Sequence, residues 1–372
     1  VMRARNDPNA QERELELALN SDPRNVEALR AMGRQVLFGE KNVAKAFEYI
    51  EEAERIEPYS VEVLWDLMAF NAFTGQPEKT LPYAERTAEL QPNNPNQYWG
   101  PAMAYQLNGQ LVPAMDYQVK ATKADPNDYE LMAGIASTWL SLGDLQQAEY
   151  WMNLADQTGA DQPYPIAIRA TIYHYREQYG LAADMAKRAL DRKIDNRLGS
   201  DGVLIRTYIS GLLRQGDIQS ALGFYQQEIP GAFTTPIDLA GQATGWGRNG
   251  RSRLVEIAVL MQKQQPGSEH AEELINIAEQ KILSVDPRLM PWQRALERAS
   301  IAAARNNREA AIEHLHKAIE LGLRERWRTL LFSNIAFNDL QDEPEFKDLV
   351  VMIEEDMQQQ REEVYQLPGI LR

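Results

Sequence analysis

The chain has 372 residues, of which 44% are hydrophobic and 25% charged, and its mean hydropathy of −0.49 excludes an integral membrane protein. Acidic residues outnumber basic ones 54 to 39, so the surface field repels phosphate backbones and we expect no direct nucleic-acid partner. The absence of cysteine excludes disulfides, thiolate metal sites and cysteine nucleophiles, and fits either the cytoplasm or the periplasm.

The amino-terminal stretch VMRARNDPNAQERE has neither an initiator methionine nor the apolar core of a signal peptide. We interpret the chain as an excised or processed fragment. A targeting segment or a further domain would then precede it in the full-length chain.

Prolines and glycines recur with a fixed period along the first part of the chain. Pro23, Pro58, Pro92 and Pro126 follow one another in steps of 35, 34 and 34 residues, and Gly75, Gly109 and Gly143 alternate with them in steps of 34. Proline cannot donate to a helical hydrogen-bond ladder, and glycine adopts the left-handed conformation that ends a helix. The sequence therefore predicts short helices joined alternately by glycine turns and proline turns.

Apolar and small residues recur inside these units at helical spacing. In the fourth unit the first helix carries Met132, Ile135, Ala136 and Trp139, and the second carries Ala148, Met152 and Ala155. Alanines let the two helices approach closely, and larger side chains fill the space beside them. One such hairpin cannot bury its own apolar face, so we expect neighbouring hairpins to stack.

These positions resemble the signature of the tetratricopeptide repeat family. The first complete unit matches at Leu29, Met32, Gly33, Val36, Ala46, Ile50, Ala53 and Pro58, with one residue inserted in its turn. The third matches at Tyr98, Ala102, Tyr105, Gly109, Ala114, Ala121 and Pro126, with Pro101 where leucine is usual. The fifth and sixth match at Ile166, Ala170, Tyr173, Ala182, Ala186 and Ala189, and at Ile205, Leu212, Gly216, Ala221 and Tyr225. The resemblance implies an all-α, right-handed superhelix of helical hairpins.

The stretch GQATGWGRNG contains Gly245-x-Gly247-x-x-Gly250, a pattern found in dinucleotide-binding loops. Such a loop follows a buried strand and opens a helix, and the preceding TTPIDLA is interrupted by proline. Gly250 lies 34 residues after Gly216, with Trp246 four residues before it, as in the other turns. We therefore interpret Trp246 as packing and Gly250 as the turn of a seventh, degenerate unit, and we expect no cofactor.

We expect two regions, a repeat solenoid over residues 1–267 and an irregular helical region over 268–372. A last helix with Phe346, Leu349, Val350, Ile353 and Met357 on one face would cap the array. The segment FSNIAFNDLQDEPEFKDLVVMIEEDMQQQRE also resembles the carboxy-terminal ends of repeat arrays in bacterial winged-helix regulators and nucleotide cyclases.

The sequence contains little that indicates catalysis or metal binding. The chain has four histidines, at positions 174, 270, 314 and 316. His314 and His316 are two residues apart and point to different sides of a helix, so we interpret them as surface residues rather than zinc ligands. We interpret His174 as a partly exposed residue of a groove. No nucleophile-elbow motif is present, and we expect no enzymatic activity.

The family resemblance places first helices on the concave side, where they contact an extended or helical partner segment. The motif register puts these residues there: Arg30, Arg34, Trp65, Phe73, Trp99, Met103, Leu107, Tyr164, His174, Tyr175, Arg206 and Arg214. Trp65 and Trp99 could instead bridge adjacent units. Family members that bind the terminal carboxylate of a partner do so with a clamp of lysine, asparagine and arginine side chains. Here Arg30 and Arg34 could imitate its first pair, but Asp66, Asn96 and Gly100 occupy the remaining positions, so we do not expect this chain to bind a partner in that way.

The sequence thus predicts a scaffold that binds a protein or peptide bringing apolar anchors and a few carboxylates. A more specific hypothesis makes it the sensory or regulatory arm of a larger bacterial signalling protein. The alternatives are a small-molecule or enzyme-subunit role centred on the region after Gly231, and self-association through solenoid edges. We expect that nucleotides and sugar phosphates leave the melting temperature of the chain unchanged, which would argue against the small-molecule role.

Overall fold

The computed structural model describes residues 8–40, 42–91, 96–191, 201–239 and 251–370, and over these residues it contains helices and turns but no strand. This confirms the all-α fold class. The chain forms two compact units: unit 1 comprises Val1–Ala124 with Ser284–Pro291, and unit 2 comprises Asp125–Leu283 with Trp292–Arg372. None of the helices in the described ranges is long and apolar enough to cross a membrane.

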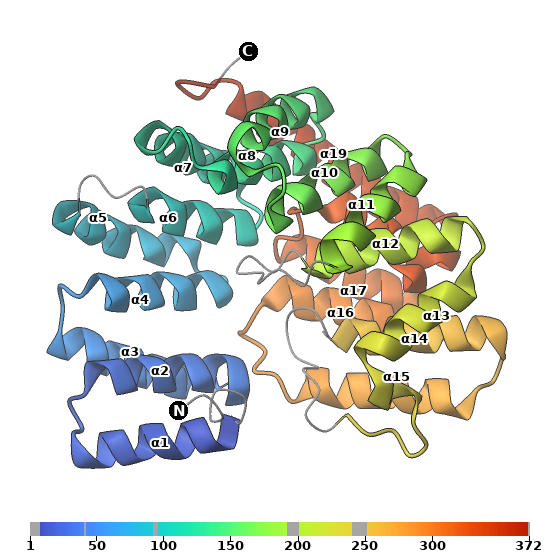
Figure 1. The fold of residues 1–372 in the computed structure, drawn as a ribbon, viewed down its shortest axis with the longest axis horizontal. Helices are drawn as coiled ribbons and strands as arrows, with labels where there is room; N and C mark the ends of the chain where they lie inside the picture. The colour runs from blue at the N-terminus through green and yellow to red at the C-terminus, as the bar shows by residue number, and fades with distance from the viewer. Residues whose placement is uncertain (1–7, 41, 92–95, 192–200, 240–250, 371–372) are drawn as a thin grey trace. The chain divides into compact units, whose positions relative to one another are not determined.

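Unit 1 is a stack of helical hairpins in chain order (Figure 1). Its elements are α1 (Pro8–Ser21), α2 (Val26–Gln35), the π-helix η2 (Val36–Glu40), α3 (Val43–Ile56), α4 (Val61–Phe73), the 3₁₀-helix η3 (Pro77–Thr80), α5 (Leu81–Leu90), α6 (Asn96–Leu107) and α7 (Leu111–Ala124). The expected inserted residue in the first complete unit coincides with η2, since one extra residue in a helix is accommodated as a π-turn. Helix α6 runs through Pro101 without ending.

The turns of unit 1 use the residues that the period predicts. Gly75 and Gly109 have φ angles of 75° and 77°, in the left-handed region that a side chain would strain. Helices α2, α3 and α4 begin at side-chain caps from Asn25, Asn42 and Ser60, whose oxygens accept from backbone N–H groups of the first turn. Pro58 follows the end of α3, and Pro92 lies outside the described residues.

A segment from much later in the chain completes the core of unit 1. Val285 and Leu289 are buried with Leu29, Ile50 and Phe70 in one hydrophobic cluster. The carboxylate of Asp286 accepts a hydrogen bond at 3.2 Å from the N–H of Val43, the first residue of α3. The N–H of Met290 donates to the carbonyl oxygen of Phe73 over 2.7 Å. Residues 284–291 therefore act as a strap across the ends of α3 and α4.

Unit 2 continues the hairpins and adds the carboxy-terminal helices. Its elements are α8 (Tyr129–Ser141), α9 (Leu145–Gly159), α10 (Pro163–Tyr175), α11 (Tyr179–Asp191), α12 (Asp201–Arg214), α13 (Ile218–Glu228), the 3₁₀-helix η4 (Pro230–Phe233), α14 (Arg251–Gln264), α15 (Glu269–Leu283), α16 (Pro291–Ala304), α17 (Arg308–Glu320), α18 (Trp327–Phe332), the 3₁₀-helix η5 (Ile335–Leu340) and α19 (Pro344–Val364). The apolar residues predicted for the fourth unit, including Ile135, Trp139 and Met152, are buried.

Turns of unit 2 reach the left-handed conformation with or without glycine. Gly143 and Gly216 have φ angles of 79° and 77°. Glu177 takes the same conformation between α10 and α11, with a φ of 59°, and Asn306 does so between α16 and α17, with a φ of 57°. Helices α16 and α17 form a hairpin that turns at Asn306 and Asn307, and Asn307 caps α17.

The carboxy-terminal helices cover the first helices of unit 2. The backbone N–H of Arg326 donates to Ser141 Oγ over 2.9 Å, and the indole N–H of Trp327 donates to the Ser141 carbonyl over 3.1 Å. Farther along, Tyr365 Oη donates to the carboxylate of Asp144 over 2.6 Å, and its ring lies 5.1 Å from that of Trp139. Four of the five residues predicted for the capping face of α19, Phe346, Leu349, Ile353 and Met357, are buried.

Two expectations about organisation stay predictions. The boundary after residue 267 falls in the turn between α14 and α15, where Gly267 has a φ of 78°, and both helices belong to unit 2. The division at 267 and 268 was predicted from the regularity of the repeat, whereas the two units are defined by their compactness. The predicted division therefore stays a prediction. The interpretation of Gly245, Trp246, Gly247 and Gly250 lies outside the described residues.

Candidate partner-binding surface

Two parallel rows of uncharged side chains follow the first helices of unit 1. On α4 the row is Trp65, Ala69 and Phe73, and on α6 it is Trp99, Met103 and Leu107. Residues four apart lie on one face of a helix, so each row is continuous. All six residues are partly exposed, whereas their neighbours Leu67, Met68 and Ala104 are buried. We call these six residues the α4–α6 strip.

The two rows of the strip meet at their tryptophans. The ring centroids of Trp65 and Trp99 are 6.1 Å apart, and their planes meet at 41°. Gly100 makes this approach possible, because a Cβ there would lie 3.1 Å from Met68 Sδ and 3.3 Å from Trp65 Cζ3. The two aromatic rings thus bridge adjacent hairpins and also leave part of their surface in solvent.

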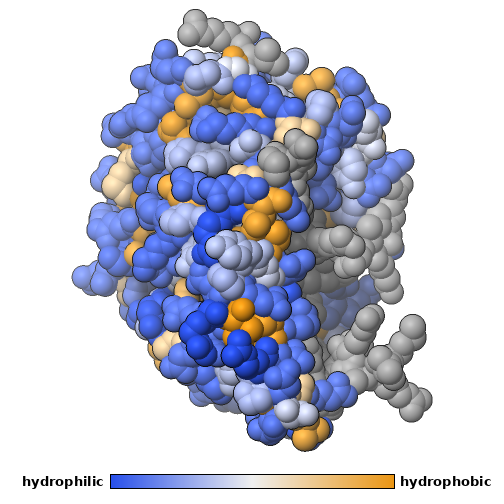
Figure 2. Space-filling model, turned by 90° about the vertical axis from the view of Figure 1, so that its left-hand side faces the viewer, coloured by the Kyte–Doolittle hydropathy of each residue, from blue (hydrophilic) through white to orange (hydrophobic). Residues whose placement is uncertain are grey.

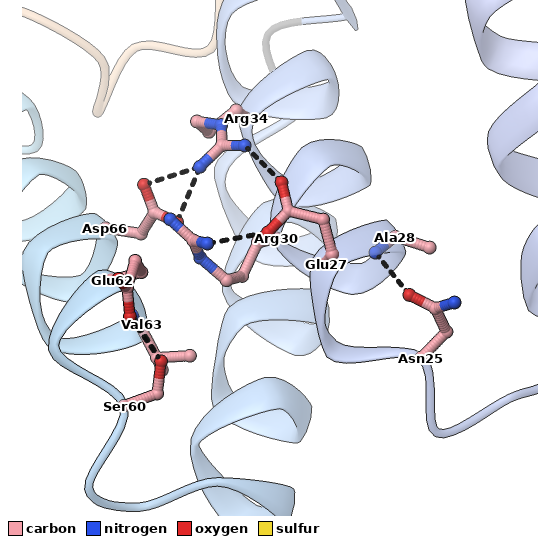
Figure 3. A network of polar contacts seen from close by, with 9 residues as sticks. All are labelled: Asn25, Glu27, Ala28, Arg30, Arg34, Ser60, Glu62, Val63 and Asp66. Atoms are coloured by element: carbon pink, nitrogen blue, oxygen red, sulfur yellow. Dashed lines mark hydrogen bonds and ion pairs between the residues drawn. The ribbon is translucent and has the colours of Figure 1, made fainter.

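An ion-pair network borders the strip on α2 (Figure 3). Asp66 accepts from Arg30 Nε and from Arg34 Nη1, both over 2.8 Å, and Glu27 pairs with Arg30 over 2.7 Å. The side chain of Arg30 is 13% exposed and that of Arg34 is 38% exposed. Asp66 therefore holds both guanidinium groups, and Arg34 is the more accessible of the two to a partner carboxylate.

The strip ends at Phe73, whose carbonyl oxygen accepts from the N–H of Met290 in the strap of residues 284–291. Phe73 packs edge-on to Phe38, with ring centroids 5.2 Å apart, and belongs with Met290 to the margin of the unit 1 core. Phe73 thus has a packing role within the chain, and the open part of the strip lies toward Trp65, Trp99 and Met103.

The predicted residues on α10 of unit 2 lie against residues of the carboxy-terminal segment. His174 is 8% exposed, and its Nε2 shares a hydrogen bond of 2.9 Å with Ser333 Oγ. The expectation of a partly exposed groove histidine is wrong, because the segment after α18 covers α10. Burial, and then the charge of Arg214, lowers the pKa of His174 to about 4.

Tyr164 and Tyr175 are partly buried on the same helix, α10. Burial raises the pKa of each phenol to about 12. The charge of Arg326 at Tyr164, and those of Arg328 and Arg326 at Tyr175, act in the opposite direction to a smaller extent. The chain itself therefore contributes a charged neighbour at both of these positions.

The two predicted arginines of α12 differ in their surroundings. Arg206 is 12% exposed and pairs with the buried Glu256 over 3.3 Å, so its position does not support a contact with a partner. Glu256 also accepts from Tyr225 Oη and pairs with Arg253 over 3.5 Å. Arg214 is exposed, and its guanidinium lies 3.8 Å from the ring centroid of Tyr179, a cation–π contact.

Sequence reasoning missed the network partners rather than the helices that carry them. The motif register marks Asp66 only as a departure from a carboxylate clamp, although its place 32 and 36 residues after the two arginines brings the three together across adjacent units. Glu256 carries no comparable signal. Within the described ranges, no three histidine, aspartate or glutamate side chains are arranged to hold a metal ion.

The face drawn in Figure 2 is mostly hydrophilic, and hydrophobic residues appear on it in small separate groups. This distribution is expected where the apolar side chains pack between helices.

No protein-family model and no curated protein matches the sequence. Among solved structures, the chain is similar to a thermophilic TPR protein of Thermus thermophilus, with 20% identity and a TM-score of 0.41 over 50% of this chain and 99% of that chain. It is also similar to the APC/C hetero-tetramer Cut9–Hcn1, with 14% identity and a TM-score of 0.46 over 87% of this chain, and spans 58% of that chain. A third similar structure is that of Pseudomonas aeruginosa pilF, with 12% identity and a TM-score of 0.41 over 69% of this chain and 100% of that chain.

Proposed function

We propose that this array of tetratricopeptide-type hairpins is a protein-binding scaffold whose partner contacts the α4–α6 strip. The observation that carries the proposal is the partial exposure of two uncharged rows on adjacent first helices. Tryptophan and methionine are enriched at interface cores, because tryptophan buries a large apolar area at a modest cost in conformational entropy and the flexible methionine adapts to the surface it meets.

The chemistry of the strip favours a segment with apolar anchors. Helix α6 carries no charged residue between positions 96 and 107, and α4 carries only Glu62 and Asp66. Both arginines of α2 already pair with Asp66, so a partner carboxylate would compete with that residue. Apolar anchors would therefore supply most of the affinity, and Arg34 would orient an acidic residue next to them.

The proposal concerns unit 1 because the equivalent helices of unit 2 have neighbours from the chain itself. Ser141 on α8 and His174 on α10 each hydrogen-bond to residues between 326 and 333. A partner at α8 and α10 would have to replace these contacts, whereas Trp65 and Trp99 keep part of their surface exposed.

A photo-crosslinking experiment tests where the partner binds. A benzophenone amino acid replaces Met103 in one sample and the exposed Glu85 on α5 in a matched control. Each protein is irradiated in extract of the source cell, and crosslinked chains are identified by mass spectrometry. We expect a protein that crosslinks from position 103, does not crosslink from 85, and is lost from the 103 sample when Trp99 is also changed to alanine. Equal crosslinking from both positions would remove the strip from the proposal.

The hypothesis of a regulatory arm in a bacterial signalling protein is the finer form of this proposal. An affinity capture that returns an upstream output domain on the same polypeptide supports it. A full-length gene product that adds only a secretion signal would contradict it.

A further inference from the structure

A cavity of about 180 Å³ lies between α15, α16 and α17 in unit 2. Its apolar wall consists of Ile282, Leu283, Ile301, Ala302 and Ala310. Ile282 and Ile301 are buried, whereas Leu283 is 60% exposed, so the cavity opens to solvent beside Leu283. A cavity of about 150 Å³ takes up benzene, so this one fits a small molecule of roughly six to nine non-hydrogen atoms.

The polar wall holds one arginine whose charge is compensated and one whose charge is not. Arg305 donates to Glu272 over 3.1 Å, to Glu279 over 2.8 Å and to Asn276 over 2.6 Å, which occupies its guanidinium. Arg298, seven residues earlier on α16, forms no ion pair with any residue that the structure describes. Arg298 is thus the unpaired guanidinium of this wall, while Glu272 and Glu279 both pair with Arg305.

His314 faces the same cavity from α17. Its side chain is partly buried, and burial followed by the charge of Arg298 lowers its pKa, while Glu313 acts in the opposite direction. The imidazole is therefore neutral at pH 7. A neutral imidazole and an unpaired guanidinium at one cavity provide N–H donors to the same anion.

We propose that the cavity binds a small carboxylic acid with a branched aliphatic chain, whose carboxylate accepts from Arg298 and His314. The apolar wall at Ile282 and Ile301 takes the chain. A carboxylate suits this site better than a phosphate, because one unpaired guanidinium balances one negative charge. The site is independent of the α4–α6 strip, and neither proposal requires the other.

The test follows the imidazole itself. The chain has four histidines, so the ring signals can be separated by NMR, and His314→Gln identifies the one that belongs to position 314. The His314 pKa is measured without ligand, with 4-methylpentanoate, and with the uncharged 4-methylpentanamide. A bound carboxylate stabilises the protonated ring, so we expect the acid to raise this pKa by about one unit. We expect the amide to leave it unchanged.

Variants separate the site from nonspecific binding. Arg298→Ala should weaken binding of 4-methylpentanoate roughly tenfold, since it removes a charged hydrogen bond. Arg308→Ala, on the exposed start of α17 and paired with Glu343, is the matched control and should bind as the unmodified chain does. Binding unchanged by Arg298→Ala, or a His314 pKa that does not respond to the acid, would overturn the proposal. A leucine-ending peptide, N-acetyl-glycyl-leucine, distinguishes a free acid from a chain terminus, and tighter binding of the peptide would overturn the assignment to a small acid.

Discussion

The indole of Trp327 donates to the carbonyl oxygen of Ser141 over 3.1 Å, although the two residues are 186 positions apart in the sequence. Ser141 is the last residue of α8, where the backbone carbonyls have no partner within the helix. The start of α18 therefore supplies a donor to the end of α8. Both residues are buried, so the hydrogen bond is not replaced by water.

Replacing Trp327 by phenylalanine should destabilise unit 2. The change keeps an aromatic ring but leaves the buried Ser141 carbonyl without its donor, which costs about 1–3 kcal/mol. Urea unfolding followed by circular dichroism measures the difference. Trp65→Phe is the control, because Trp65 is partly exposed and its replacement should cost less than the change at Trp327. Equal costs at the two positions would contradict the role of the hydrogen bond.

Acid should destabilise the packing around His174. Its pKa is about 4 in the folded chain and near 6.5 when unfolded, so the unfolded chain binds the proton more tightly. The stability contribution is complete above pH 6.5 and is lost as the pH falls toward 4, by about 3 kcal/mol. Melting temperatures between pH 4 and 7 are compared for the unmodified chain and for His174→Gln. The glutamine variant should lose less stability over this range, and parallel profiles would rule out His174 as the titrating group.

The buried carboxylate of Glu256 should be costly to neutralise. Burial raises its pKa, but the charges of Arg253 and Arg206 together lower it further, and the net shift is downward. Glu256→Gln leaves two arginines without a counter-charge and should cost about 3–5 kcal/mol in unfolding free energy. Glu320→Gln, which removes the exposed partner of Lys317, should have little effect. Guanidinium unfolding curves measure the loss of unfolding free energy in the two variants. A small loss for Glu256→Gln would mean that water compensates the charges of the two arginines.

Two helical glycines should respond oppositely to alanine. A Cβ at Gly211 on α12 would lie 2.5 Å from Ala183 Cβ and 3.1 Å from the Tyr179 carbonyl oxygen, so Gly211→Ala should cost about 1–3 kcal/mol. A Cβ at Gly223 on α13 meets nothing within 4 Å, and Gly223→Ala should stabilise by about 0.5–1 kcal/mol. Thermal melts of the two variants give opposite shifts if α11 and α12 pack as described.

Trp99→Ala separates packing from recognition on the α4–α6 strip. Trp99 contacts Trp65 but keeps part of its ring in solvent, so we expect a loss of unfolding free energy of about 1–2 kcal/mol, below that of a fully buried tryptophan. The folded variant should lose the partner that crosslinks from Met103. If the variant melts below room temperature, Trp99 is primarily a packing residue.

Local pattern predicted the hairpins well, because a turn depends on a few adjacent residues. The 34-residue glycine period identified Gly75, Gly109 and Gly143, and each adopts a positive φ. The burial of Ile135 and Trp139 followed from helical spacing alone. Glu177 was not predicted as a left-handed turn residue, since only the surrounding hairpin imposes that conformation.

What covers each helix face could not be predicted in the same way. His174 lies at a position that the register makes a groove residue, and Ser333, 159 residues later, buries it. Contacts of that separation depend on which surfaces meet, and no local period records them. The strap of residues 284–291 was not predicted for the same reason, because SVDPRLMP is interrupted by Pro287 and carries no signal of the helices that it contacts.

The strap also affects the order in which the chain can fold during synthesis. Hairpins generally form as they leave the ribosome, from the amino terminus onward. Val285 and Leu289, however, belong to the same hydrophobic cluster as Leu29 and Ile50. The amino-terminal unit therefore acquires its full core only after residue 289 has been translated, and a nascent chain halted before residue 285 leaves that cluster incomplete.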